Sequence, residues 1–188
     1  MGALQKKLTP HSPNFFDNSP PCWAESTGQS DRIISIISLE HGLVHYFAVG
    51  ARSARSKKSA HLDLASIIKY EASNNHNQNY LVQADTINSF QGIKDNLKKI
   101  SLTFSFLEIV YHLLPAEQED KEMFDSLKNF LTSLDLSHSP LNDKKMASKF
   151  GQYLLRHLGY PPVPHEKISL SDYFETLMNR KIISKEIL

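Results

Sequence analysis

The chain has 188 residues, of which 40% are hydrophobic and 22% charged, a composition that is typical of a folded globular protein and excludes a disordered chain. Its 21 Lys and Arg residues nearly balance 20 Asp and Glu residues, so any signal for a polyanionic partner must be local. The single cysteine, Cys22, excludes an internal disulfide or a site of several thiolates and indicates a reducing compartment such as the cytoplasm.

Residues 1–21 are predicted to form a loose arm, because Pro, Ser and Asn are frequent in this part of the chain. A short strand is expected near Cys22–Glu25, where the two preceding prolines would confine it to a sheet edge. Lys6 and Lys7 are followed by no apolar run, so no signal peptide is expected. No window reaches the roughly 20 apolar residues of a membrane span, and we expect a cytoplasmic protein without a membrane partner.

The next segment, residues 31–90, carries the alternating pattern of β-strands. Four runs predict strands: Arg32–Leu39, Leu43–Val49, Leu62–Ala72 and Tyr80–Phe90. The short spacing of the first two runs predicts a hairpin, and the Asn-rich residues 73–79 predict the turn between the last two. Four strands in about 60 residues predict a small, strongly bent antiparallel sheet or barrel over residues 22–90.

From Gln91 onward the apolar period becomes helical, which predicts an all-α domain over residues 91–188 and a boundary at Phe90–Gly92. One long helix is expected from Gln91 to Leu114. Further helices are expected at about Lys121–Leu134 and Asp143–Leu158, and from Ser169 or Ser171, with Ser169 and Asp172 as a candidate capping box. The predicted fold class is therefore α+β, a small β domain followed by a helical domain.

The connection between the second and third predicted strands is the segment most suggestive of function. It holds four cations among small and hydroxyl residues, and no acid occurs between Glu40 and Asp63; the cations are Arg52, Arg55, Lys57 and Lys58. The cations of such a loop can bind along a phosphate backbone, which releases the counterions that are bound to the nucleic acid. The alternative is a solvated surface loop, because charge runs are common on protein surfaces.

Catalytic motifs are absent from the sequence. His41 and His45 lie around the predicted hairpin, and no His-Glu-x-x-His pattern occurs on a helix. Neither a phosphate loop nor a nucleophile elbow is present, and Cys22 has no base placed beside it. We therefore expect no catalytic residue, no metal, no cofactor and no stoichiometric zinc.

Aromatic residues divide into two groups. Those at helical spacing are most simply core residues: Phe104, Phe106, Tyr111, Phe124, Phe130, Phe150 and Tyr153. Tyr46, Phe47, Tyr70 and Tyr80 lie on predicted strands, where either face is open to them. One of these four on the outer face could stack on a base.

Taken in order, these segments resemble the RecO family of recombination and repair mediators. The resemblance is carried by eight stretches: Gly28–Gly42, Ala48–Arg52, Arg55–Lys57, Leu62–Tyr70, Ala84–Phe90, Phe106–Leu114, Phe124–Leu131 and Leu154–Tyr160. Many family members carry a four-cysteine zinc module after the last stretch, whereas Pro161–Lys167 contains no cysteine here. A second departure is Ser19–Ser26, which stands where family members have an apolar first strand.

The resemblance implies an oligonucleotide-binding barrel (OB-fold) followed by a helical domain. It implies a non-enzymatic protein that binds single- and double-stranded DNA, anneals strands, and loads the recombinase with a RecR-like protein and the single-stranded-DNA-binding protein. The expected DNA contacts are Arg52, Arg55, Lys57 and Lys58, with Lys69 as an addition.

An acidic, apolar peptide tail of a partner would need cations beside a hydrophobic groove, and Lys149, Arg156 and Arg180 are available. The alternative function is an adaptor of the same pathway that binds these protein partners and has weak or no DNA affinity.

Overall fold

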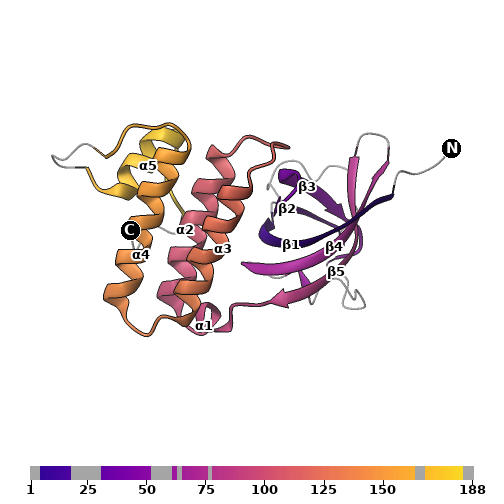
Figure 1. The fold of residues 1–188 in the computed structure, drawn as a ribbon, viewed down its shortest axis with the longest axis horizontal. Helices are drawn as coiled ribbons and strands as arrows, with labels where there is room; N and C mark the ends of the chain where they lie inside the picture. Colours follow the sequence, from indigo (N-terminus) through magenta and orange to yellow (C-terminus); the bar gives the residue numbers. More distant parts are fainter. Residues whose placement is uncertain are drawn as a thin grey trace. The chain divides into compact units, whose positions relative to one another are not determined.

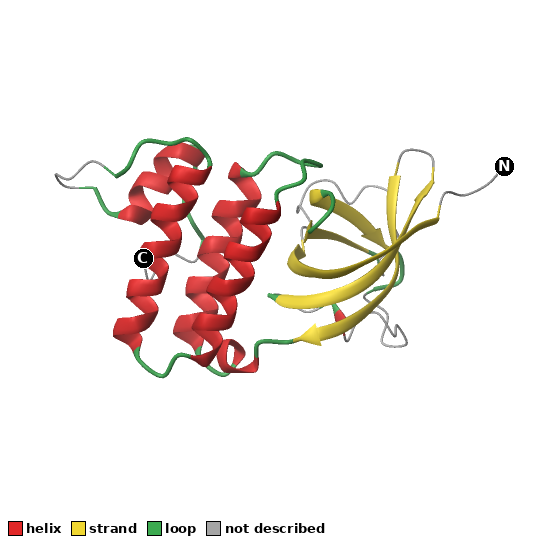
Figure 2. Cartoon of the chain, viewed as in Figure 1, coloured by secondary structure: helices red, strands yellow, loops and turns green. Residues whose placement is uncertain are grey.

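The computed structural model describes residues 5–17, 31–51, 61–62, 65–75, 78–163 and 168–183. The chain divides into two compact units. The β unit comprises Met1–Ser89 and Pro115–Phe124, and the helical unit comprises Phe90–Leu114 and Asp125–Leu188. Figures 1 and 2 show the strands in the first unit and most of the helices in the second. This mixture of strands and helices confirms the predicted α and β content.

The described part of the β unit contains five strands: β1 (Gln5–Asp17), β2 (Arg32–Ser38), β3 (Gly42–Ala48), β4 (Ser66–Asn75) and β5 (Gln78–Asn88). Their order is β1-β2-β3-β5-β4, and β1 pairs with both β2 and β4, so the pairings close on themselves as a barrel. All pairings are antiparallel except β3 with β5, which meet in parallel at Phe47 and Tyr80. The predicted hairpin is confirmed, because β2 and β3 pair in register from Arg32–Ala48 to Ser38–Gly42.

The interior of the β unit is filled by side chains that alternate along β2 to β5. The buried cluster consists of Ile34, Ile36, Val44, Tyr46, Ala48, Ala51, Leu62, Ile68, Tyr70, Leu81 and Ala84. The hydroxyls of Tyr46 and Tyr70 lie 3.2 Å apart inside it, which satisfies both polar atoms without water.

Strand β1 corrects the prediction of a loose arm over residues 1–21. Backbone pairing on both sides provides the hydrogen bonds that local composition could not indicate. The register against β4 shifts between Lys6 and Thr9 and again between Thr9 and Ser12. Such irregular positions accommodate Pro10, which has no N–H to donate. The strand expected at Cys22–Glu25 lies outside the described residues.

The last two strands begin and end differently from the prediction. Strand β4 is shifted toward the carboxyl end of its predicted run, and β5 begins two residues early, because the Asn-rich tract itself pairs as Asn74 with Asn79 and Asn75 with Gln78. The Asn74 side-chain amide also donates to Asn79 Oδ1 at 2.9 Å. Backbone hydrogen bonds of a hairpin need no apolar side chains, so the ladder continues through polar residues.

The segment before α3 lies on the turn of the first hairpin. Glu117 donates its N–H to the Leu43 carbonyl at 2.9 Å, and Leu43 and Ala116 form an isolated parallel bridge. Gly42 has a φ of 64°, and a Cβ built on it would meet the Gln118 carbonyl oxygen. This turn therefore requires glycine for both its conformation and its space.

In the described residues after the strands there are five helices: α1 (Gln91–Lys94), α2 (Leu97–Leu113), α3 (Lys121–Leu136), α4 (Pro140–His157) and α5 (Leu170–Met178). In the helical unit, Phe106, Phe130 and Phe150 pack with ring centroids 4.5 to 5.2 Å apart. These rings and Phe124 of the β unit are buried, as predicted for core positions. Phe104, Tyr111 and Tyr153 are half-buried.

The expected single helix from Gln91 to Leu114 is wrong, because it is broken between Lys94 and Leu97. Asn96 caps α2, and its side chain accepts from the N–H groups of Lys98 and Lys99. An Asn side chain competes with the helical backbone and so favours a cap over a helix interior. Asp135 of α3 accepts the Ile93 N–H at 2.9 Å, which holds α1 in place.

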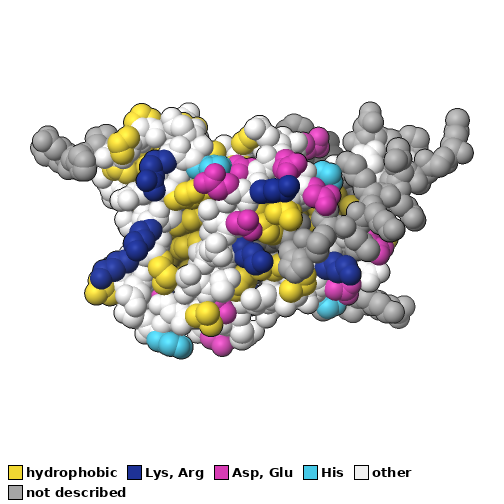
Figure 3. Space-filling view, viewed as in Figure 1, with side chains coloured by type: hydrophobic (Ala, Val, Ile, Leu, Met, Phe, Trp, Pro, Cys, Tyr) yellow, Lys and Arg dark blue, Asp and Glu magenta, His cyan; other side chains and the backbone are white. Residues whose placement is uncertain are grey.

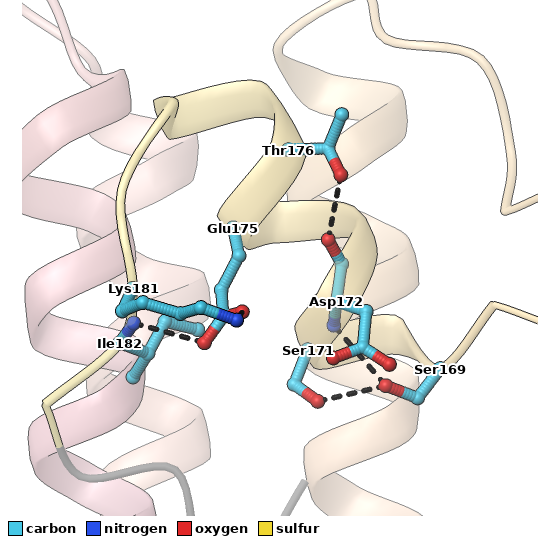
Figure 4. A network of polar contacts seen from close by, with 7 residues as sticks. All are labelled: Ser169, Ser171, Asp172, Glu175, Thr176, Lys181 and Ile182. Atoms are coloured by element: carbon cyan, nitrogen blue, oxygen red, sulfur yellow. Dashed lines mark hydrogen bonds and ion pairs between the residues drawn. The ribbon is translucent and has the colours of Figure 1, made fainter.

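Two other helices are longer than the periodicity predicts. Helix α3 continues to Leu136, and α4 begins at Pro140 rather than Asp143, since proline is favoured in the first turn of a helix. Helix α5 begins as predicted: Ser169 Oγ accepts the Asp172 N–H at 3.1 Å (Figure 4). Glu175 of α5 accepts hydrogen bonds from the Lys181 ammonium and the Ile182 N–H, which both follow the helix in the chain.

Candidate nucleic-acid interface

The residues on both sides of the basic segment, which comprises residues 52–60, belong to the β unit. Arg52, Arg55, Lys57 and Lys58 lie outside the described residues, but Ala51 and Leu62 on either side belong to the buried cluster. On one side Asp31 Oδ1 accepts the Gly50 N–H at 2.7 Å. On the other side the Thr86 N–H donates to His61 Nδ1 at 3.3 Å. The segment is therefore carried by ordered residues at both ends.

Lys69 is exposed on β4, as a surface contact requires. It lies opposite Asp85 of β5 in the antiparallel register, and Glu71 follows it on the same strand. Two nearby carboxylates weaken the positive potential at this ammonium group. Lys69 is thus a poorer candidate for a phosphate contact than a cation in the basic segment.

Strand alternation separates the four tyrosine and phenylalanine candidates. Tyr46 and Tyr70 point into the core, where burial, and then the neighbouring Tyr70, raise the pKa of Tyr46. Phe47 and Tyr80 are half-buried on neighbouring strands, with ring centroids 5.9 Å apart and planes inclined by 39°. These two rings can offer a face to a ligand, and the parallel pairing of β3 and β5 that joins them could not be predicted from local sequence.

His45 occupies the same strand as Phe47 and contacts Ser35, with Nδ1 2.9 Å from the serine hydroxyl. Burial lowers the pKa of His45, and the negative charge of Glu117 opposes this effect by raising the pKa. The net direction is downward, so His45 is neutral at pH 7 and adds no charge to this strand.

The three cations proposed for partner binding are not gathered into one site. Lys149 and Arg156 are exposed on α4. Arg180 instead contacts α2, with Nη1 2.6 Å from His112 Nε2 and Nε 4.0 Å from Glu108 Oε1. Burial first, and the charge of Arg180 second, lower the pKa of His112.

A groove of about 590 Å³ adjoins Lys149 at the junction of α3 and α4. Its lining residues are Ser133, Leu136, Ser137, His138, Ser139, Asn142, Lys145, Met146 and Lys149. The end of α3, residues 137–139 and the first half of α4 form its walls, and hydrophobic periodicity, which predicts helices, does not show how the turn between two helices folds.

No cluster of three or more His, Cys, Asp or Glu side chains is placed to bind a metal ion in the described parts of the chain. Among the helices that the structure describes, none has both the length and the apolar character needed to cross a bilayer.

Comparison with known proteins gives a consistent result. Residues 24–90 match the family model "Recombination protein O N terminal". The "DNA repair protein RecO" of Dehalococcoides mccartyi strain CBDB1 is 30% identical over 136 residues, which cover 72% of this chain and 52% of that protein.

Proteins of the same name from other bacteria also match. That of Trichodesmium erythraeum is 29% identical over 60% of this chain and 39% of its own length. That of Rubrobacter xylanophilus is 27% identical over 72% of this chain and 53% of its own length. The chain thus spans about half the length of several curated relatives that it matches. The family model and these relatives together show that this chain is similar to the RecO family.

Proposed function

We propose that this chain is a DNA-binding protein of recombinational repair. The observation that carries the proposal is the acid-free segment 52–60 with its four cations, held between the core residues Ala51 and Leu62. A basic segment on a fixed base can follow a phosphate backbone while its ends stay in place. The relatives' printed name, DNA repair protein, supports the same role.

The proposal extends to the domain that carries this segment. We regard residues 22–90 as the nucleic-acid-binding domain of OB-fold type, and residues 91–188 as the helical domain. Strands β2 to β5 of this domain, together with β1 from the residues before it, can bind single-stranded nucleic acid through cations and partly exposed rings. Phe47 and Tyr80 supply such rings, and Arg52, Arg55, Lys57, Lys58 and Lys69 supply the cations.

The proposed biological role is that of a mediator. It would bind single- and double-stranded DNA in the cytoplasm, anneal strands, and load a recombinase with a RecR-like protein and the single-stranded-DNA-binding protein. The resemblance to the family supports this role, and the role requires no catalytic residue, metal or cofactor.

The test is replacement of Arg52, Arg55, Lys57 and Lys58 by Ala, with binding to labelled single-stranded DNA measured against salt. The expected result is weaker binding and a log-log salt slope that falls by roughly 0.7 for each phosphate interaction removed, or about 3 in total. The protein should stay folded, since the four polar side chains lie outside any apolar pattern.

A matched control removes four cations from helices instead: Lys98, Lys121, Lys128 and Lys144 to Ala. It changes the net charge equally but leaves the basic segment intact. If the salt slope falls by the same amount in both quadruple variants, or falls in neither of them, the basic segment is not the DNA-binding surface.

The second candidate function is the adaptor, favoured by the near-neutral net charge of +1. In this alternative Lys149, Arg156 and Arg180 serve an acidic peptide of the single-stranded-DNA-binding protein. Absence of salt-dependent DNA binding in the unaltered protein would favour it over the DNA-binding proposal.

A further inference from the structure

The exposed face of α4 is a row of polar and cationic side chains. Residues at spacings of three, four and seven lie on one side of a helix, and the exposed residues in this row are Asn142, Lys145, Lys149, Gln152 and Arg156. By helical rise, the two lysines are about 6 Å apart along the axis, and Arg156 lies about 10 Å beyond Lys149. Figure 3 shows Lys and Arg side chains over this helix.

No acid shares this row. Asp143 is the one acid of α4, and its neighbours one and two turns later, Ala147 and Phe150, are buried, which places it on the opposite side. None of the side chains that line the groove at the amino-terminal end of α4 is acidic. An extended surface with cations and no carboxylate complements an anionic chain.

The chemistry of the groove favours phosphate over a peptide. Seven of its nine lining residues are polar, including Ser133 and Ser139, whose hydroxyls can donate hydrogen bonds to phosphate oxygens. Its apolar residues are Leu136 and Met146, fewer than the several apolar anchors that a groove for a peptide usually provides. Spacings of about 6 and 10 Å between the cations correspond to about two and three nucleotide steps of 3.4 Å each.

We propose that this α4 row, with the groove at its amino-terminal end, is a second contact surface for the phosphate backbone of nucleic acid. The inference rests on the proposed DNA-binding function and adds a site on the helical unit that the basic segment does not include. A protein with a separate contact surface on each unit can hold two strands at once.

Lysine footprinting tests the surface directly in the unaltered protein. An acylating reagent is applied with and without a single-stranded homopolymer oligonucleotide, and modification is read by mass spectrometry. Lys145 and Lys149 are expected to become protected severalfold, whereas Lys144, which is exposed about 100° away around the same helix, keeps its reactivity. Equal reactivity of all three with and without the oligonucleotide overturns the proposal.

The second measurement is the salt slope of DNA binding, compared between a double variant of the row and a double control variant. Lys145→Ala with Lys149→Ala should reduce the salt slope of single-stranded DNA binding by roughly 1.4, at about 0.7 for each phosphate interaction. It should also abolish capture of a second labelled strand by protein bound to an immobilised one. The control, Lys98→Ala with Lys144→Ala, removes the same charge from exposed positions outside the row and should behave as the unaltered protein.

The outcomes separate this inference from the proposed function. If the quadruple variant of the basic segment loses binding but the Lys145 and Lys149 variant matches its control, only the second surface is wrong. If the basic-segment variant keeps full binding while the α4 variant loses it, the second surface stands and the proposed DNA-binding role of residues 52–60 fails. Protection of Lys145 and Lys149 by an Asp-rich peptide, but not by the oligonucleotide, would assign the groove to a protein partner and overturn the inference.

Discussion

Gly42 at the turn between β2 and β3 is expected to tolerate no side chain. In Gly42→Ala, the left-handed backbone costs about 1 to 2 kcal/mol, and the new Cβ also meets the Gln118 carbonyl. Gly50→Ala is the matched control, because Gly50 has a φ of 69° but nothing within 4 Å of its Cβ position. Urea unfolding should show a larger loss of stability for Gly42→Ala, and equal losses would mean that the 115–124 segment can move aside.

His112 is expected to make folding stability depend on pH. Its pKa is lowered in the folded chain, so as the pH falls through about 6.5 the unfolded chain binds a proton that the folded chain resists. Stability therefore decreases on acidification and levels off below the folded pKa. His45 contributes in the same direction.

Thermal melts between about pH 8 and pH 5 measure this effect. His112→Gln should flatten part of the pH dependence, because it removes a group whose pKa is lowered by folding. The explanation fails if His112→Gln retains the full decrease in melting temperature.

At the scale of elements, the break between α1 and α2 depends on one side chain. Asn96→Ala removes the acceptor for two backbone N–H groups and should cost about 1 kcal/mol of stability. Ser139→Ala at the start of α4 is the control, since Ser139 makes no side-chain cap hydrogen bond there. Chemical unfolding of both variants should show a clear loss only for Asn96→Ala, and a loss of equal size at Ser139 would contradict the cap assignment.

The helical elements also show how far periodicity alone can be taken. The positions of Phe106, Phe130 and Phe150 predict a buried helical face, and all three rings are buried. The same periodicity runs through Asp95 and Asn96 and so misses the break, because hydrophobic spacing contains no information about which backbone N–H groups are capped. Ser169 can be identified as a cap because its signal is local and chemical.

At the scale of the whole molecule, the rings of Phe47 on β3 and Tyr80 on β5 allow a test of whether the protein prefers single-stranded to duplex DNA. Phe47→Leu with Tyr80→Leu should lower affinity for single-stranded DNA at least about tenfold, since stacking contributes about 1 to 3 kcal/mol per base. The salt slope and the affinity for duplex DNA should change little, because the phosphate interactions remain.

Val82→Ala serves as the control for this pair. Val82 is exposed two residues after Tyr80 on β5, so its replacement removes apolar surface without removing a ring. If Val82→Ala weakens binding as much as the ring variant, or if the ring variant weakens duplex binding equally, base stacking is not the role of these residues.

Local sequence is enough to predict the class of the elements and the chemistry of the basic segment. Strand and helix periods, the β2–β3 hairpin and the Ser169 cap depend on neighbours within a few residues, so local preferences suffice for them. The stretches that resemble the RecO family point to the family that the comparisons support.

Long-range packing, in contrast, settles which distant residues meet. It pairs β1 with β2 and β4, brings Phe47 beside Tyr80, and turns Arg180 toward His112. Each of these contacts joins residues whose separation along the chain has no fixed period. Their formation depends on which surfaces remain to be buried and which backbone groups remain to be paired once the local elements exist.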